Sequence, residues 1–323
     1  MKKIEIFNWK KNATARVEKN GTKVLGKQNQ PKHILESRGE KIFNTVMIAL
    51  GLLITLVTLY PIWYTLIASV SNPLLVENGS VLLLPKRISF DSYVQAAQKD
   101  GLWVAYANTI FYTVFGVLVN MAFSTTMAYA LSRKRLGFRK FFILFTVFTM
   151  WFNAGIIPLF ITFKDFGLLN SRSGILFGFA INTYNMIILK SFFEQVPDSL
   201  EEAAFMDGAS NIRIFTTIYL PLSKPALATV GMFYAVNRWN SYFWAMNLLR
   251  DDNKMPLQVL LKKLIVDRVV NETEAAIVTE QSLSSPTTVI YAIIVLAIIP
   301  MMVAYPFVQK YFKSGMTIGA VKG

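Results

Sequence analysis

The chain has 323 residues, of which 54% are hydrophobic and 14% are aromatic, and its formal net charge at pH 7 is +14. This composition is too apolar for an ordinary soluble domain and indicates a membrane protein. The sequence contains no cysteine, which excludes disulfide bonds, thiolate metal sites and a cysteine nucleophile. Its single histidine, His33, lies outside every hydrophobic stretch, and we assign it no function.

Six stretches are long enough to cross about 30 Å of hydrocarbon, which requires about 20 apolar residues. We therefore predict an all-α membrane protein with six transmembrane helices. Residues 1–37 are polar and basic and are predicted to form a cytoplasmic N-terminal extension, while residues 38–323 form one six-helix domain. The six stretches run approximately over residues 42–70, 106–131, 141–163, 174–193, 226–249 and 287–308.

Lysine and arginine are distributed unevenly between the two sides of these stretches. Both termini and loops 132–140 and 190–225 hold 22 of them, whereas loops 71–105, 164–173 and 250–286 hold 10, balanced by 10 acidic residues. Positive charge gathers on the cytoplasmic side of membrane proteins, so both termini and loop 190–225 are predicted to be cytoplasmic. The basic charge then reports orientation and contact with anionic membrane lipid, and no nucleic acid partner is expected.

A mixed polar and apolar stretch separates the fourth and fifth hydrophobic stretches. Asp198 or Ser199 is predicted to cap a short helix there, with a glutamate three residues later completing a capping box. Gly208 can adopt the left-handed conformation that ends a helix. Ser210 is predicted to cap a second short helix, and Pro221 to close it. From these residues alone, the stretch could be an amphipathic connector that lies on the membrane surface.

This stretch contains Glu202-Ala203-Ala204, then Gly208 after three residues, Ile218 after nine more, and Leu220-Pro221 after one more. That order resembles the EAA loop in membrane-spanning subunits of bacterial ABC importers. Residues 38–323 resemble the carbohydrate-uptake permeases of the maltose-transporter type, particularly the subgroup of oligosaccharide and complex-polysaccharide systems of Gram-positive bacteria. The resemblance implies a type I ABC importer fold in which loop 198–225 is a cytoplasmic coupling helix seated on an ATPase. The residues implied in ATPase coupling are Glu201, Glu202, Ala203, Ala204, Asp207, Gly208, Ala209, Ile218, Leu220 and Pro221.

Polar residues in the fourth and fifth stretches are candidates for a translocation path. Arg238 is the one charged residue that we place deep in the membrane, where an arginine costs at least about 2.5 kcal/mol unless it finds polar partners. It should therefore face a polar cavity or pair with backbone carbonyls. It could line a path for hydroxyl- or carboxylate-rich substrates, or it could only hydrogen-bond a partner subunit or extend outward to the membrane surface. The candidate path residues are Asn182, Asn185, Asn237, Arg238, Asn240 and Tyr242.

The loop over residues 250–286 is long and polar, and loops of this length are uncommon unless they are functional or disordered. In the maltose-type permeases, the corresponding loop reaches into the solute-binding protein. Its helical part, residues 257–266, could equally be a lid packed on the membrane surface. The candidate contact residues for the binding protein are Asn271, Glu272, Glu274, Glu280 and Ser282.

The sequence contains no Gly-rich phosphate loop, paired carboxylates, metal-ligand cluster or nucleophile with a base. We therefore expect no catalytic residue, no metal and no bound cofactor, with ATP and Mg²⁺ used by a separate ATPase. The resemblance implies a permease subunit of a binding-protein-dependent importer in the bacterial cytoplasmic membrane, moving a saccharide by alternating access. The implied partners are an ATPase dimer, a second, homologous permease subunit, an extracytoplasmic solute-binding protein and membrane lipid.

Two other functions are weighed against saccharide import. One is an ABC permease for a different small polar solute, such as an amino acid or a peptide. The other is an ion-coupled secondary transporter, which usually carries an acidic residue at mid-membrane, whereas none of the six stretches contains Asp or Glu. A membrane-embedded enzyme would need clustered catalytic side chains, which the sequence does not offer.

Overall fold

The computed structural model describes the backbone of residues 38–152, 154–274 and 286–320, and the side chains of these ranges except 267–286 and 307–320. The described residues form helices and turns, and no strand occurs among them. The predicted extension, residues 1–37, lies outside the described part, so its role stays a prediction.

Contacts divide the chain into two units, Met1–Thr58 and Leu59–Gly323. The described part of the first unit is the beginning of α1 (Arg38–Ser69), a helix with mostly exposed apolar side chains. The second unit holds the end of α1 and every other element, and both parts of the candidate site lie within it.

Three of the six predicted spans are single long helices: α1, α4 (Leu102–Ser132) and α15 (Pro286–Ala320). Across the described ranges, these three are long and apolar enough to cross a membrane, and a fourth crossing is made if α5 (Arg139–Trp151) and α6 (Ile156–Asp165) count as one bent span. Their lengths follow from uninterrupted apolar sequence, about 1.5 Å of rise per residue.

The other three predicted spans are each divided into two helices. The third becomes α5 and α6, the fourth α7 (Arg172–Phe177) and α8 (Thr183–Phe193), and the fifth α12 (Lys224–Asn240) and α13 (Phe243–Leu248). Each of these three segments is therefore a broken helix. Where such breaks lie within a membrane, neighbouring protein groups must satisfy the freed backbone groups.

Shorter elements connect the long helices. Three of them contact α15: α2 (Pro73–Glu77), α3 (Asp91–Gln98) and α14 (Leu257–Glu274). The 3₁₀ turn η2 (Asp252–Lys254) precedes α14 and contacts α4. The helical part predicted for loop 250–286 is thus present as α14. Between α8 and α12 lie α9 (Asp198–Met206), α10 (Asn211–Ile214), the π-helix η1 (Phe215–Tyr219) and α11 (Leu220–Leu222).

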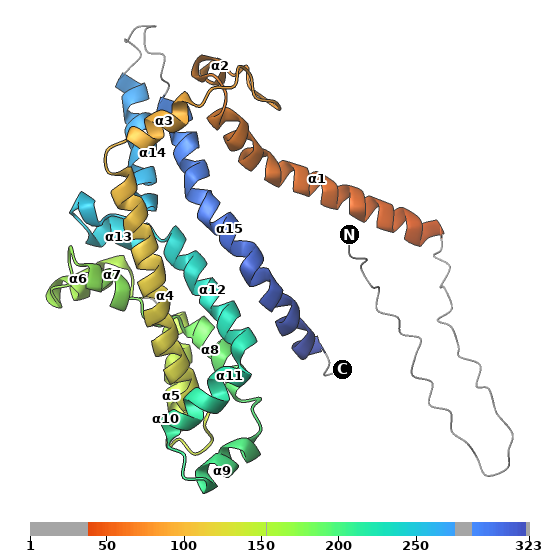
Figure 1. Cartoon of the computed structure of the whole chain (residues 1–323), viewed down its shortest axis with the longest axis vertical. Helices are drawn as coiled ribbons and strands as arrows, with labels where there is room; N and C mark the ends of the chain where they lie inside the picture. The colour runs from red at the N-terminus through yellow and green to blue at the C-terminus, as the bar shows by residue number, and fades with distance from the viewer. Residues whose placement is uncertain (1–37, 153, 275–285, 321–323) are drawn as a thin grey trace, which may run out of the picture. The chain divides into compact units, whose positions relative to one another are not determined.

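Helix α4 is the centre of the second unit, and Figure 1 shows it running beside α12, with α8 near its end. The buried side chains between these three helices include Met186, Leu189 and Val230. Apolar burial alone drives little association between helices in lipid, so close packing and interhelical hydrogen bonds carry more weight. One such bond joins the buried hydroxyls of Ser124 and Tyr234, whose oxygens are 2.6 Å apart.

The predicted helix ends around residues 198–225 are partly correct. Gly208 has a φ of +75°, and the Ser210 hydroxyl accepts a hydrogen bond from the Arg213 amide, as expected for a stop and a cap. The predicted side-chain cap of α9 is wrong, because Pro197 occupies the cap position and Asp198 is already helical. Pro221 does not close the second helix but lies inside α11, one residue before its end.

Candidate functional site

A cavity of about 810 Å³ opens beside the breaks in the fourth and fifth spans. All six candidate path residues line it, so the structure brings together side chains that come from α8, α12 and the turns at their ends. Among them, Asn182, Asn237, Asn240 and Tyr242 are exposed, whereas Asn185 and Arg238 are buried. The cavity lining is Asn120, Phe179, Ile181, Asn182, Tyr184, Asn185, Phe233, Tyr234, Val236, Asn237, Arg238, Asn240, Ser241, Tyr242, Phe243 and Trp244.

The guanidinium of Arg238 is held by the broken fourth span. Its Nη1 donates to the Ile175 carbonyl at 2.6 Å, and its Nη2 donates to the carbonyls of Leu176 and Phe179 at 3.0 and 3.1 Å. Its Nε donates to Asn120 Oδ1 at 2.8 Å. These acceptors include carbonyls at the end of α7, which have no helical partner because the helix stops there. Arg238 thus lines the cavity and also pairs with backbone carbonyls, so it has both kinds of polar surroundings that its place in the membrane called for. Its part in a translocation path stays a prediction.

Two more side chains hydrogen-bond the backbone at the break between α7 and α8. The side-chain amide of Asn120 donates to the carbonyls of Phe179 and Ala180 at 2.6 and 2.8 Å. The Tyr234 hydroxyl accepts from the backbone N–H of Asn182 at 3.0 Å. The Asn182 side chain then caps α8 by accepting from the Asn185 amide at 3.1 Å. The break is thus satisfied by α4 and α12, and its geometry fixes one wall of the cavity.

Aromatic rings form a part of the lining that the sequence-based list did not include. Phe179 and Trp244 lie 5.5 Å apart between ring centroids, and Tyr184 and Phe233 add further exposed surface. The dense aromatic content of residues 239–244 was the available signal, but only the turn between α12 and α13 directs these rings to the cavity. Amides and aromatic faces together suit a solute with hydroxyl groups and apolar ring faces.

The loop at residues 198–225 forms the second part of the candidate site. In α9 and the following turn, Glu202, Ala203, Asp207 and Gly208 are exposed, and the apolar Met206 is 88% exposed. Ala204, Ala209, Ile218 and Leu220 are partly buried, and Pro221 is exposed. Ile212 adds a further exposed apolar side chain that the sequence-based list omitted. A mixed surface of this kind is able to receive another protein.

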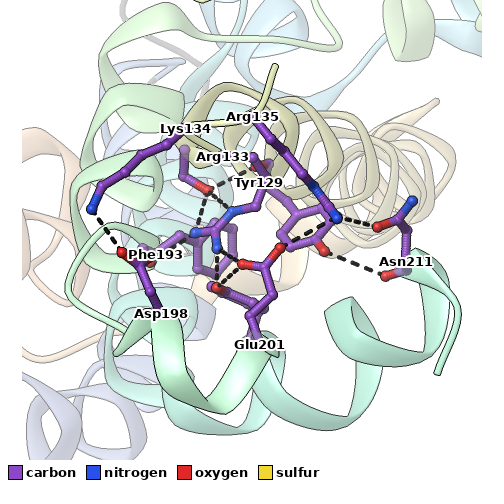
Figure 2. A network of polar contacts seen from close by, with 10 residues as sticks. Tyr129, Arg133, Lys134, Arg135, Phe193, Asp198, Glu201 and Asn211 are labelled. Atoms are coloured by element: carbon purple, nitrogen blue, oxygen red, sulfur yellow. Dashed lines mark hydrogen bonds and ion pairs between the residues drawn. The ribbon is translucent and has the colours of Figure 1, made fainter. Parts of the chain in front are cut away.

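Glu201 differs from its neighbours because it is buried and bound within the chain, as Figure 2 shows. Its Oε2 accepts from Arg133 Nη1 and from the Tyr219 hydroxyl, the latter at 2.8 Å. Arg135 approaches its other oxygen at 3.3 Å. Glu201 is thus held within the chain, whereas Glu202 is exposed, and the part of both residues in ATPase coupling stays a prediction.

Arg133 is the partner that places α9 against the end of α4. Its guanidinium lies 4.1 Å from the Tyr219 ring centroid and donates to the Phe193 carbonyl at 3.2 Å and to the Ser132 hydroxyl. Burial and the hydrogen bond to Glu201 raise the pKa of Tyr219, so its hydroxyl stays protonated and donates. The hydrogen bond from Lys134 and its positive charge lower the pKa of Asp198 in an exposed pair beside this network.

A polar cluster ties η2 and the start of α14 to the other end of α4. The Asn108 amide donates to the carbonyls of Asn253 and Met255 at 2.8 and 3.1 Å, and its oxygen accepts from Arg172 at 2.9 Å. Thr109 accepts from the Leu257 amide at 2.7 Å. None of these side chains is among the candidate site residues chosen from the sequence.

The residues predicted to contact the binding protein come later in the sequence than the segment that this cluster holds. Asn271, Glu272 and Glu274 lie in the backbone of α14, whereas Glu280 and Ser282 fall outside the described residues, so these contacts stay predictions. In the described ranges, no group of three or more His, Cys, Asp or Glu residues is placed to hold a metal ion. The expectation that this chain binds no cofactor stays a prediction.

Residues 101–318 match the family described as the binding-protein-dependent transport system inner membrane component. The chain belongs to this family. It is 38% identical over 286 residues to the polygalacturonan/rhamnogalacturonan transport system permease protein YtcP of Bacillus subtilis, covering 88% of this chain and 99% of that protein. The chain is therefore a multi-pass membrane permease of the ABC importer type.

Solved structures agree with this assignment. A crystal structure of a bacterial ABC transporter involved in the import of the acidic polysaccharide alginate contains a chain that is 48% identical, with a TM-score of 0.80 over 86% of this chain and 99% of that one. A second chain, from an alginate ABC transporter in complex with its alginate pentasaccharide-bound periplasmic protein, is 14% identical with a TM-score of 0.58 and shares the fold. The predicted family and the type I importer fold are confirmed.

Proposed function

We propose that this permease imports an oligosaccharide that contains uronic acid, driven by ATP that separate subunits hydrolyse. The observation that carries the proposal is the 48% identity to a chain of a transporter for the acidic polysaccharide alginate. The similarity to a polygalacturonan/rhamnogalacturonan permease supports it independently, because galacturonan is also a polymer of uronic acid.

The chemistry of the cavity is consistent with such a solute. Amide side chains at Asn182, Asn237 and Asn240 can donate to hydroxyl and carboxylate oxygens, and the aromatic rings offer faces for sugar C–H groups. No Asp or Glu is among the described residues that line the cavity, so no carboxylate there repels an anionic sugar. The hydrogen bonds of Arg238 go to backbone carbonyls and Asn120, so the proposal assigns Arg238 no hydrogen bond to the carboxylate of the sugar.

The proposed assembly contains two ATPase subunits, a second and different permease subunit, and a solute-binding protein outside the membrane. Six spans are few for an enclosed path, which supports a second permease. The positive charge of the termini and of loops 132–140 and 190–225 supports a cytoplasmic position for α9, where the ATPase binds. ATP and Mg²⁺ are bound by the ATPase, and this chain contributes no catalytic residue and no cofactor site.

The test is uptake into proteoliposomes that contain the full transporter, supplied with its solute-binding protein. We expect uptake of oligogalacturonate or alginate oligosaccharides at least about tenfold faster than of neutral maltooligosaccharides of the same length, equivalent to about 1.4 kcal/mol of discrimination. Faster uptake of the neutral sugar would refute the preference for uronic acid. Uptake of an amino acid or a peptide, with none of any sugar, would refute saccharide import altogether.

Two variants separate the cavity from the rest of the chain. Asn237→Ala and Asn240→Ala remove exposed amides from the lining and are expected to reduce uptake of the acidic sugar. Asn247→Ala, on the exposed surface of α13 and outside the cavity lining, is the matched control and is expected to transport normally.

A further inference from the structure

The structure ties α9 to α4 through a buried ionic joint. Arg133 follows directly after α4, Glu201 lies in α9, and Tyr219 ends η1, so three segments that are far apart in sequence meet in one network (Figure 2). We propose that Arg133, Glu201 and Tyr219 form a rigid joint that passes the ATP-driven movement of α9 to α4. This inference rests on the proposed function of α9 as the ATPase contact.

Burial makes the joint stiff. The side chains of Arg133 and Glu201 are 8% and 11% exposed, so water does not compete strongly for their charges. Charges inside a protein interact more strongly than at its surface, and an unpaired buried charge is costly. The pair therefore stays closed when α9 is displaced. The Phe193 carbonyl and the Tyr219 ring further restrict the guanidinium to one position.

Helix α4 leads from this joint to the cavity wall. Asn120 and Ser124 belong to the same uninterrupted helix as the residues that adjoin Arg133. With a rise of 1.5 Å per residue, they lie about 14–20 Å along the axis from Arg133. They bind the break between α7 and α8 directly or through Tyr234. A displacement of the end of α4 thus reaches the cavity wall through hydrogen-bonded contacts.

The exposed pair Lys134–Asp198 supplies a matched control, because it connects the same two regions without burial. Its side chains are 80% and 56% exposed, and Lys134 Nζ lies 2.7 Å from Asp198 Oδ2. Exposed ion pairs are screened by water and salt and contribute little. If charge pairing alone mattered, the two pairs would have similar effects, whereas a rigid buried joint predicts that only the Arg133–Glu201 pair is required.

The experiment uses the assembled transporter and spin labels at two exposed positions, Ser199→Cys in α9 and Ala130→Cys near the end of α4. This chain has no natural cysteine, so the two introduced sites are its only labelled positions, and the partner subunits are used in cysteine-free form. With the joint intact, we expect the label-to-label distance to be the same with and without ATP. A distance that changes with ATP in this protein would overturn the proposal. The measurement needs no saccharide, so an error in the proposed substrate does not affect it.

The second arm replaces both buried charges together in Arg133→Met/Glu201→Met, because removing both leaves no unpaired charge. We expect the ATPase still to co-purify and to hydrolyse ATP within about twofold, while solute imported per ATP falls at least tenfold and the label distance changes with ATP. Lys134→Gln/Asp198→Asn is expected to keep both properties. Normal import per ATP in the Met/Met variant would overturn the proposal, and if that variant fails to assemble, the distance in the intact protein decides.

Discussion

Arg238 lies in the fifth predicted span with its guanidinium against the carbonyl oxygens of a broken helix. The carbonyls at the end of α7 carry partial negative charge, and the arginine supplies donors where the helix cannot. Gly116 of α4 makes room for it, since a Cβ there would approach Arg238 Nε to 2.8 Å. The residue is therefore a structural clamp on the cavity wall.

Replacing this clamp is expected to damage stability more than substrate choice. Arg238→Met removes the side-chain donor from the carbonyls of Ile175 and Leu176, whereas the Phe179 carbonyl keeps its bond from Asn120. Each group left unsatisfied costs about 1–3 kcal/mol. We expect a lower unfolding midpoint for the detergent-solubilised transporter, measured by thermal denaturation. Arg238→Lys is expected to restore only part of the loss, because an ammonium lacks the planar fork of donors.

The neighbouring Asn237→Ala serves as the control for this prediction. Asn237 is exposed in the cavity, so its loss is expected to reduce uptake while leaving the unfolding midpoint nearly unchanged. An unfolding midpoint for Arg238→Met equal to that of the natural protein, combined with altered sugar selectivity, would instead make Arg238 a substrate contact.

The residue type alone predicted that Arg238 needs polar partners, but not which ones. The partners arise because the fourth span breaks after α7, and Gly178, the residue after α7, packs closely against Phe163. A Cβ at Gly178 would lie 2.3 Å from the Phe163 ring, so this close approach between distant segments depends on glycine. Contacts of that kind depend on tertiary packing, which hydrophobic periodicity does not encode.

At the scale of elements, the bend between α9 and α10 was the feature best predicted from sequence. Glycine at position 208 and serine at position 210 carry local conformational information, and both behave as expected. The cap of α9 was mispredicted because the helix begins at Asp198, directly after Pro197, so Asp198 is not in the cap position. The burial of Glu201 was also missed, since nothing in its sequence position distinguishes it from the exposed Glu202.

The bend itself can be tested through the conformation of Gly208. Its φ of +75° is unfavourable for other residues, yet a Cβ there would meet no atom within 4 Å. Any loss on substitution therefore comes from the backbone, about 1–2 kcal/mol for most residues. We expect Gly208→Val to weaken co-purification of the ATPase strongly and Gly208→Asn only slightly, because asparagine tolerates the left-handed region.

A comparison of these two variants distinguishes backbone strain from steric blocking of the ATPase. Valine and asparagine are similar in size, so equal losses for both would indicate that the ATPase contacts this position and has no space for a side chain. Circular dichroism of the purified chains is the control that the remaining helices are intact.

At the scale of the whole chain, α4 is the element that connects the distant polar clusters. Asn108 and Thr109 bind the segment before α14, Asn120 and Ser124 bind the broken fourth span, and Arg133 follows its last residue. These polar residues lie in or beside a hydrophobic stretch of the sequence, where hydrogen bonds to neighbouring helices are favoured. Their partners lie up to 148 residues away, so only the fold identifies them.

The end of α4 near α14 is expected to control the response to the solute-binding protein. Asn108→Asp keeps an acceptor for Arg172 but removes the amide donors to the carbonyls of Asn253 and Met255. The turn that leads into α14 then loses two hydrogen bonds, each worth about 0.5–1.5 kcal/mol. Because the proposed binding-protein contact follows in α14, we expect stimulation of ATP hydrolysis by loaded binding protein to fall about tenfold.

Basal ATP hydrolysis without binding protein is expected to stay unchanged in Asn108→Asp, since the joint at Arg133 and Glu201 is untouched. Asn247→Asp is the matched control, because the exposed Asn247 amide donates to the Phe243 carbonyl of its own helix at 2.7 Å. If both variants responded equally to binding protein, the cluster around Asn108 would have no part in the coupling. A selective loss in Asn108→Asp would mean that α4 receives signals at both of its ends, from the binding protein at one and from the ATPase at the other.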